Sequence, residues 1–195
     1  MEEIRATKSD IRMDMAKTIA TLSENQVNEK TKAIENRLFE FANFLEARTA
    51  LLYVQSDLEV QTSDIIKKTI EYNKVVVLPA FNPETFEIKL LKVDNPEKEL
   101  KPGPRGVLEP DPSLCKNVPI DRIDIAIIPG VAFDEKGGRI GTSRGYYDRL
   151  IPKLAITTRK VALTFEDQIL QQVPIESHDK HVDIIITDKR VIYKI

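Results

Sequence analysis

Apolar residues recur at helical spacing through the first 48 residues. In residues 4–22 the apolar positions fall three, four or seven residues apart, which predicts an amphipathic helix. Ser23 followed by Gln26 has the pattern of a capping box, so we expect a second helix to begin there and to continue through Leu45. The pattern predicts an N-terminal helical pair.

Short apolar runs then alternate with helical patterns. Such alternation predicts an α/β fold with an open, mainly parallel sheet flanked by helices. The run 123–130 is apolar at almost every position, as expected of a central parallel strand that is buried on both faces. We expect strands at 50–54, 75–80, 86–93, 123–130, 161–165 and 182–187, and further helices at 65–72 and 145–154.

Residues 96–119 break this alternation. They contain six of the eleven prolines and few periodic apolar positions. We expect a long loop that stays on the surface of one domain spanning residues 1–195.

Composition narrows the class of protein. A hydrophobic content of 42%, a charged content of 31% and a net charge of −2 are typical of a soluble globular protein, and argue against general binding to nucleic acid or to anionic membranes. One cysteine and two histidines exclude an intramolecular disulfide and a Cys/His zinc site, and a reducing cytoplasmic location is expected. The N-terminal residues resemble no signal peptide, and no apolar run is long enough to span a bilayer.

Five of the seven glycines lie between Gly130 and Gly145, together with Arg139 and Arg144. Glycine allows a backbone to approach a ligand closely, and guanidinium groups and helix N-termini bind phosphate oxygens. The segment is neither a Walker A motif nor a dinucleotide fingerprint, so it predicts a phosphate site without identifying the nucleotide. A solvated turn with ordinary surface arginines is the alternative.

Carboxylates and aromatic residues follow this loop. Asp148 lies three residues into the next predicted helix and Asp179 precedes the last long strand, so the two carboxylates are candidate ligands for Mg²⁺. A first-turn aspartate favoured by the helix dipole is the alternative for Asp148. Of Tyr146 and Tyr147, one is expected to contact a ligand and the other to anchor the helix. The nearby histidines, His178 and His181, are expected in a solvated turn.

Several motifs together resemble the 5-formyltetrahydrofolate cyclo-ligase family, also called methenyltetrahydrofolate synthetases. PGVAFD followed by GYYDR at this spacing is the most specific of them, and the resemblance runs nearly end to end. The motifs are Lys8-x-x-x-Arg12, the LEP tripeptide 108–110, PGVAFD at 129–134, the stretch 139–149 that ends in GYYDR, and the stretch 168–183 that begins at Gln168 and ends in VD.

The resemblance implies a sheet related to sugar-phosphate isomerase and CoA-transferase-like folds. It also implies MgATP-dependent closure of 5-formyltetrahydrofolate to 5,10-methenyltetrahydrofolate with release of ADP and phosphate. In that reaction ATP phosphorylates the formyl oxygen, N10 attacks the activated carbon and phosphate departs. Such chemistry needs positioning and charge neutralisation rather than a protein nucleophile.

Residue roles follow from the same resemblance. It implies Mg²⁺ ligands at Asp148 and Asp179, folate contacts at Ser56, Gln61 and Tyr146, and catalytic roles for Arg144 and Tyr146. A folate substrate and a nucleotide are the expected partners of a monomer or weak homo-oligomer. The expected ATP contacts are Lys8, Arg12, Arg139, Ile140, Gly141, Thr142, Ser143, Arg144, Gly145, Tyr146 and Tyr147.

Two positions depart from the family pattern. Ser143 replaces a loop glycine, and Gln61 stands where we expect the family's folate-contacting glutamate, with Glu59 as a possible substitute two residues earlier. These departures leave two alternatives open. One is a paralogue that keeps the nucleotide loop but acts on another small molecule, and the other is a non-enzymatic folate-binding regulatory module.

Overall fold

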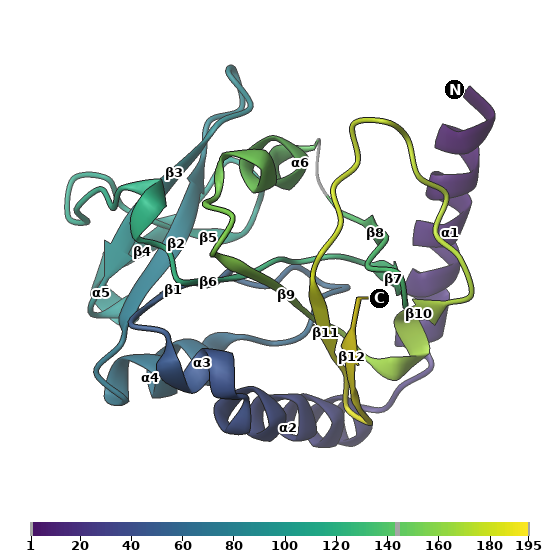
Figure 1. Cartoon of the computed structure of the whole chain (residues 1–195), viewed down its shortest axis with the longest axis horizontal. Helices are drawn as coiled ribbons and strands as arrows, with labels where there is room; N and C mark the ends of the chain where they lie inside the picture. Colours follow the sequence, from purple (N-terminus) through teal and green to yellow (C-terminus); the bar gives the residue numbers. More distant parts are fainter. Residues whose placement is uncertain (1, 143–144, 195) are drawn as a thin grey trace.

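An open seven-stranded sheet forms the centre of the computed structural model, which describes residues 2–142 and 145–194, with side chains from Thr7 onward (Figure 1). Its strand order is β12-β11-β9-β6-β1-β2-β3, and only the edge strands β3 and β12 run antiparallel to their neighbours. The expected mainly parallel sheet is therefore confirmed, with β6 in the middle as its continuous apolar run predicts. The strands are β1 (Thr49–Leu51), β2 (Val75–Phe81), β3 (Ile88–Val93), β6 (Ile125–Ile127), β9 (Arg159–Leu163), β11 (Ile184–Ile186) and β12 (Val191–Tyr193).

Helices cover both faces of the sheet. On one face lie α2 (Glu24–Glu40), α3 (Ala42–Glu46) and α4 (Ser63–Glu71), and on the other lie the short helix α6 (Tyr146–Leu150) and a 3₁₀ turn, Ile151–Lys153. Because each layer buries its own apolar side chains against the sheet, the core has two halves. The largest fully buried side chains include Leu38, Phe44, Ile65, Phe133 and Phe165.

The second predicted helix is divided. Its capping box is present, with the Gln26 N–H donating to Ser23 Oγ over 3.2 Å. Phe41 takes an extended conformation, with φ −74° and ψ 120°, and ends α2 one residue before α3 begins. The Phe41 ring is buried in the core. Tertiary packing therefore divides the helix that the apolar pattern predicts as continuous.

The first helix, α1 (Glu2–Ala20), packs beside a second, three-stranded sheet. This sheet has the order β10-β7-β8 and is formed by β7 (Ala132–Asp134), β8 (Arg139–Ile140) and β10 (Ile169–Leu170). Met15 of α1 joins Val131 and Ile140 in a small apolar cluster there. Part of the glycine-rich segment, expected to be a loop, is thus a β7–β8 hairpin that faces α1.

Residues 96–119 are more ordered than the expected loop. They contain α5 (Pro96–Glu99) and an antiparallel hairpin of β4 (Leu100–Pro102) and β5 (Leu108–Pro110). At the hairpin tip, Gly106 has a positive φ of 75°, a conformation that glycine adopts without strain. Three-residue strands rich in proline carry no periodic signal, which is why the prediction was wrong here.

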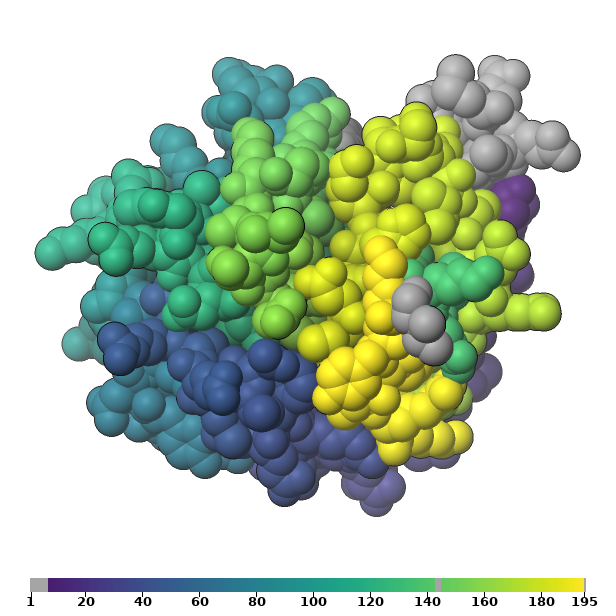
Figure 2. Space-filling model, in the orientation of Figure 1, coloured from purple at the N-terminus to yellow at the C-terminus, as the bar shows by residue number. Residues whose placement is uncertain are grey.

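The C-terminal strands lie at the surface beside α2, as Figure 2 shows in yellow and blue. Arg37 of α2 donates to the Lys189 carbonyl over 2.8 Å, which joins the helix to the turn before β12. Among the residues that the structure describes, no helix is long and apolar enough to cross a membrane.

Candidate functional site

Three loops meet at the carboxyl ends of the central parallel strands, where open α/β sheets bind ligands. Gln168, fully buried, holds them together. Its amide nitrogen donates to the carbonyls of Leu58 and Val131 over 2.9 and 2.8 Å, and its amide oxygen accepts from Phe165 N over 3.0 Å. Because each partner follows a different strand, one side chain sets the relative position of the three loops.

Asp134 shapes the β7–β8 hairpin from inside. Its carboxylate accepts from the N–H groups of Gly138 and Val173, each over 2.8 Å. Gly137 has a φ of 82°, and a Cβ there would lie 2.3 Å from the Val182 carbonyl oxygen, so only glycine fits this turn. The PGVAFD aspartate is therefore a structural residue.

Arg139 lies beneath the glycine-rich loop rather than on its surface. Its side chain is 3% exposed, and it donates to the Pro129 carbonyl over 3.0 Å and to Asp148 Oδ1 over 2.8 Å. A Cβ at Gly141 would lie 2.7 Å from Arg139 Nη1, so this glycine lets the loop pass over the guanidinium group. Arg139 thereby fixes both the loop and the expected metal ligand Asp148.

The two cations of α1 face this loop. Arg12 donates from Nε to the Gly141 carbonyl over 2.9 Å. Lys8 forms ion pairs with Glu176, at 3.0 Å, and with Asp179, and the three side chains are 7–11% exposed. Tertiary packing thus brings the motif Lys8-x-x-x-Arg12 to the glycine-rich loop.

Acidic groups converge around Lys8. Glu176, His178 and Asp179 each offer one ligand atom within 4.8 Å of the others, an arrangement that could hold a metal ion. Burial raises the pKa of Asp179, but hydrogen bonds from Glu176 N and from Lys8 outweigh it, so this pKa lies below its ordinary value. The carboxylate is therefore ionised at neutral pH, as a metal ligand must be.

Asp148 reaches the same region from α6. Its Oδ1 accepts from the Lys180 N–H over 3.2 Å, one residue beyond Asp179. The structure therefore brings the two expected metal ligands to one edge of the site, although their metal role stays a prediction. His178 is exposed and His181 partly exposed, in line with the turn expected for them.

Both tyrosines of GYYD are buried, each with 3% of its surface exposed. The Tyr146 ring packs edge-on against Phe81 at 4.9 Å, and its hydroxyl donates to the Asn82 carbonyl over 3.3 Å. The buried Tyr147 hydroxyl has no hydrogen-bond partner among the described residues. Burial, and to a smaller extent the negative charge of Glu59, raises the pKa of this hydroxyl. Tyr147 therefore stays a neutral donor at physiological pH.

The segment after β1 presents Glu59, not Gln61, to the site. Glu59 is 7% exposed; it accepts from Ser56 N over 2.8 Å and from Thr142 Oγ1 over 3.2 Å, whereas Gln61 is exposed. The segment turns at residues 57–58, where Glu59 N donates to the Ser56 carbonyl over 3.0 Å, instead of running extended. A carboxylate therefore stands beside the glycine-rich loop, and the folate contact expected of Gln61 is not supported by its position.

A cavity of about 370 Å³, which we call the central cavity, opens between these elements. An adjoining recess of about 10 Å³ is lined by Glu59 and Tyr147, and Arg105 and Val107 line both it and the central cavity. The buried Ser56 hydroxyl has no hydrogen-bond partner among the described residues. The central cavity is lined by Ser56, Pro83, Pro104, Arg105, Val107, Thr142 and Tyr146.

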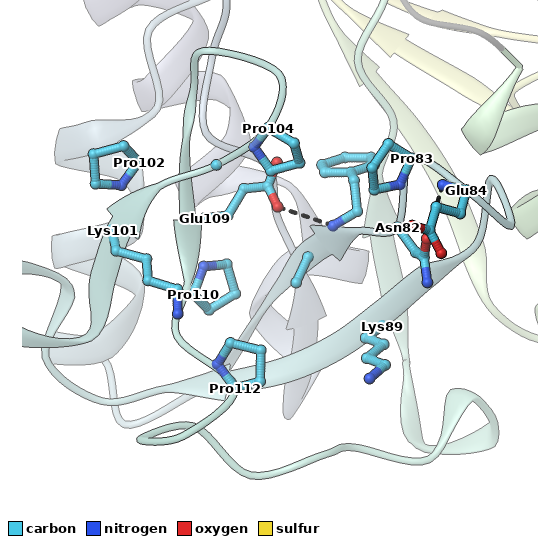
Figure 3. Close-up of a pocket in the computed structure, with 13 residues that line it drawn as sticks. Asn82, Pro83, Glu84, Lys89, Lys101, Pro102, Pro104, Glu109, Pro110 and Pro112 are labelled. Atoms are coloured by element: carbon cyan, nitrogen blue, oxygen red, sulfur yellow. Dashed lines mark hydrogen bonds between the residues drawn. The ribbon is translucent and has the colours of Figure 1, made fainter.

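A second cavity of about 440 Å³ lies behind the β4–β5 hairpin and shares Pro83 and Pro104 with the central cavity (Figure 3). Five more of the side chains around it are prolines or lysines, namely Lys89, Lys101, Pro102, Pro110 and Pro112 (Figure 3). Glu109 of the LEP tripeptide joins the hairpin to β2 by accepting from Phe81 N over 2.9 Å. Burial raises the pKa of Glu109, which is consistent with a structural role.

Sequence reasoning missed part of this site. Ser143 and Arg144 lie outside the described residues, so the expectations placed on them are not addressed. Gln168 lay within the motif 168–183 without a role, and no role was expected of Arg105 in the proline-rich stretch. Only the flanking Pro104 and Gly106, which indicate a tight turn, could have drawn attention to Arg105.

Comparisons with known proteins agree with this arrangement. Residues 4–188 match the sequence model of the 5-formyltetrahydrofolate cyclo-ligase family. The chain is 28% identical to the probable 5-formyltetrahydrofolate cyclo-ligase of Caenorhabditis elegans, over 98% of both chains. It is 27% identical to the 5-formyltetrahydrofolate cyclo-ligase of Escherichia coli K12, over 87% of this chain and 94% of that one. The NMR structure of Aquifex aeolicus 5,10-methenyltetrahydrofolate synthetase superposes with a TM-score of 0.83 at 28% identity, over 96% of this chain and 92% of that one.

Proposed function

Because this chain belongs to the 5-formyltetrahydrofolate cyclo-ligase family, we propose that it closes 5-formyltetrahydrofolate to 5,10-methenyltetrahydrofolate with MgATP, releasing ADP and phosphate. The observation that carries the proposal is the convergence of α1, the glycine-rich hairpin and the 176–180 segment beside the central cavity. Cations, backbone donors and carboxylates thereby lie next to a space that suits a small organic substrate.

The donor set fits a nucleotide and its metal ion. The Lys8 ammonium lies between two carboxylates, Glu176 and Asp179, which supports a cation-binding role for this place. Arg12 and the backbone of residues 139–142 offer cationic and neutral donors to phosphate oxygens. Asp148 and Asp179 would hold Mg²⁺. The Lys8 ammonium would then contact the phosphates of the bound ATP.

Bound ATP supplies the phosphoryl group that converts the formyl oxygen into a leaving group. The chain's own residues supply position and charge. Arg12 and Lys8 neutralise negative charge on the α1 side, and Arg139 holds Asp148 in place. Arg144, beyond the described residues, stays the predicted cation nearest the reacting oxygen.

The central cavity would hold the folate. Tyr146 gives it an aromatic wall, and Glu59 and the neutral Tyr147 hydroxyl offer an acceptor and a donor at the inner end of the recess. With N10 held against the formyl carbon, ring closure needs no protein nucleophile.

The test is to mix the purified protein with ATP, Mg²⁺ and 5-formyltetrahydrofolate at neutral pH and to follow the near-ultraviolet absorbance of the methenyl product. ATP-free samples control for acid-driven cyclisation. Asp148→Asn should keep the fold, checked by circular dichroism, and should lose at least about 100-fold in turnover if it removes a metal ligand.

The outcomes separate the alternatives. ATP-dependent product with an inactive Asp148→Asn variant supports the proposal. Nucleotide binding without product favours the paralogue with another substrate. Tight folate binding without ATP turnover favours the regulatory folate-binding module.

A further inference from the structure

We propose that Arg105 is a substrate-contacting residue that donates hydrogen bonds to the 4-oxo oxygen of the bound pteridine ring. The inference rests on the proposed function, since it names a contact to that substrate. It concerns a residue of the β4–β5 hairpin, far in sequence from the glycine-rich loop.

The backbone at Arg105 is held in a tight turn. Gly103 N donates to the Val107 carbonyl over 2.8 Å, and Gly106 N donates to the Gly103 carbonyl over 3.1 Å. Pro104 restricts the preceding residue, and the positive φ of Gly106 completes the turn. The base of the Arg105 side chain is therefore positioned before any ligand arrives.

Aromatic rings fix the guanidinium group itself. Its Cζ lies 4.0 Å from the centre of the Phe81 ring and 5.8 Å from that of Tyr146. Stacking of a planar guanidinium on an aromatic face leaves its edge free to donate hydrogen bonds. Since Tyr146 also lines the central cavity, the stacked arginine lies at the cavity wall.

Among the residues that the structure describes, none uses the donors of Arg105. Across residues 7–142 and 145–194, no acceptor receives a hydrogen bond from this side chain, although it is partly buried and lines both the central cavity and the recess. A guanidinium group offers five N–H donors and no acceptor. An oxygen acceptor on a ligand in the cavity would satisfy them.

The recess completes a complementary pattern. Glu59, Tyr147 and Arg105 all line the recess, whose volume of about 10 Å³ admits one polar group from a ligand seated in the central cavity rather than a whole ring. The 2-amino-4-oxopyrimidine edge of a pteridine presents donors and a carbonyl acceptor side by side. Glu59 would accept from the amino and ring N–H groups, and Arg105 would donate to the carbonyl.

Direct binding tests the inference without turnover. Isothermal titration of 5-formyltetrahydrofolate, with no ATP present, compares the wild type with Arg105→Met, Arg105→Lys and the control Arg122→Met, an exposed arginine outside both cavities. We expect Arg105→Met to raise the Kd about 10–100-fold and Arg105→Lys to raise it less, since a lysine keeps the charge but not the fork. Arg122→Met and the Kd for ATP should not change.

A substrate analogue identifies the contacted atom. The 4-amino-4-deoxy analogue of 5-formyltetrahydrofolate lacks the carbonyl acceptor, so the wild type should prefer the 4-oxo compound and Arg105→Met should lose that preference. If the wild type binds folate and both Arg105 variants bind it equally well, this inference alone is overturned. If the wild type binds ATP but no folate, the proposed function fails and the inference with it.

Discussion

The buried Arg139 and the partly exposed Asp148 form an ion pair, with Nη2 and Oδ1 2.8 Å apart. The sequence assigns this arginine to the phosphates and this aspartate to the metal. In the structure, Nη1 of the arginine also donates to the Pro129 carbonyl, so both terminal nitrogens are used within the protein, whereas the buried Nε has no partner among the described residues. Arg139 is therefore placed to orient the carboxylate and the loop above it.

Arg139→Lys should lower the apparent affinity of the enzyme for its metal ion. A lysine can pair with Asp148 or with the Pro129 carbonyl, but it cannot hold both in the geometry of a guanidinium fork. We expect the Mg²⁺ concentration for half-maximal turnover to rise about 10–100-fold, as when other groups that orient metal ligands are changed. Titration of Mg²⁺ at saturating ATP and folate measures the effect.

The matched control for that variant is Arg159→Lys, at an exposed position at the start of β9. It should leave the Mg²⁺ titration unchanged. An Arg139→Lys enzyme with wild-type Mg²⁺ dependence would show that Asp148 needs no such support.

Glu59→Gln should impair folate binding, whereas Gln61→Glu should have little effect. The carboxylate of Glu59 is buried beside Ser56 and Thr142, and an amide cannot accept at both oxygens, so a loss of about 1–3 kcal/mol in folate binding is expected. Gln61 is exposed, so a charge added there is screened by solvent. Folate titration of both variants checks the comparison; a stronger effect from Gln61→Glu would contradict it.

Glu35→Gln should destabilise the fold in a pH-dependent way. Burial raises the pKa of Glu35, but hydrogen bonds from Lys32 and Lys68 outweigh it, so the pKa lies below its ordinary value of 4.5. A carboxylate with a depressed pKa contributes its stability above the ordinary value and loses it as the pH falls through the depressed one. At neutral pH the variant should lose about 1–3 kcal/mol of unfolding free energy.

Urea unfolding of the wild type and Glu35→Gln from pH 7 to pH 3 measures this difference. It should be constant at neutral pH and shrink below about pH 4.5. The exposed control Glu71→Gln should show almost no difference at any pH. A Glu35 effect that stays constant down to pH 3 would mean that packing, not charge, holds the side chain.

Local pattern in the sequence determined the order of helices and strands, the capping box at Ser23, and the central place of the strand at 123–130. These features depend on residues within one or two turns, where periodicity and capping act directly. The motifs also located the glycine-rich segment and its following aspartate. The break at Phe41 and the short strands β4, β5, β7, β8, β10 and β12 escaped detection, because two or three positions outside a longer apolar run are too few to establish a period.

Only the tertiary structure decided which side chains meet. Lys8 reaches Asp179 from 171 positions away because α1 packs on the β7–β8 hairpin, a contact that no local pattern records. The turn after β1 buries Glu59 and exposes Gln61, and the β4–β5 hairpin places Arg105 over Phe81. Such juxtapositions arise from the burial of apolar surface between distant segments, which sets the positions of the polar groups those segments carry.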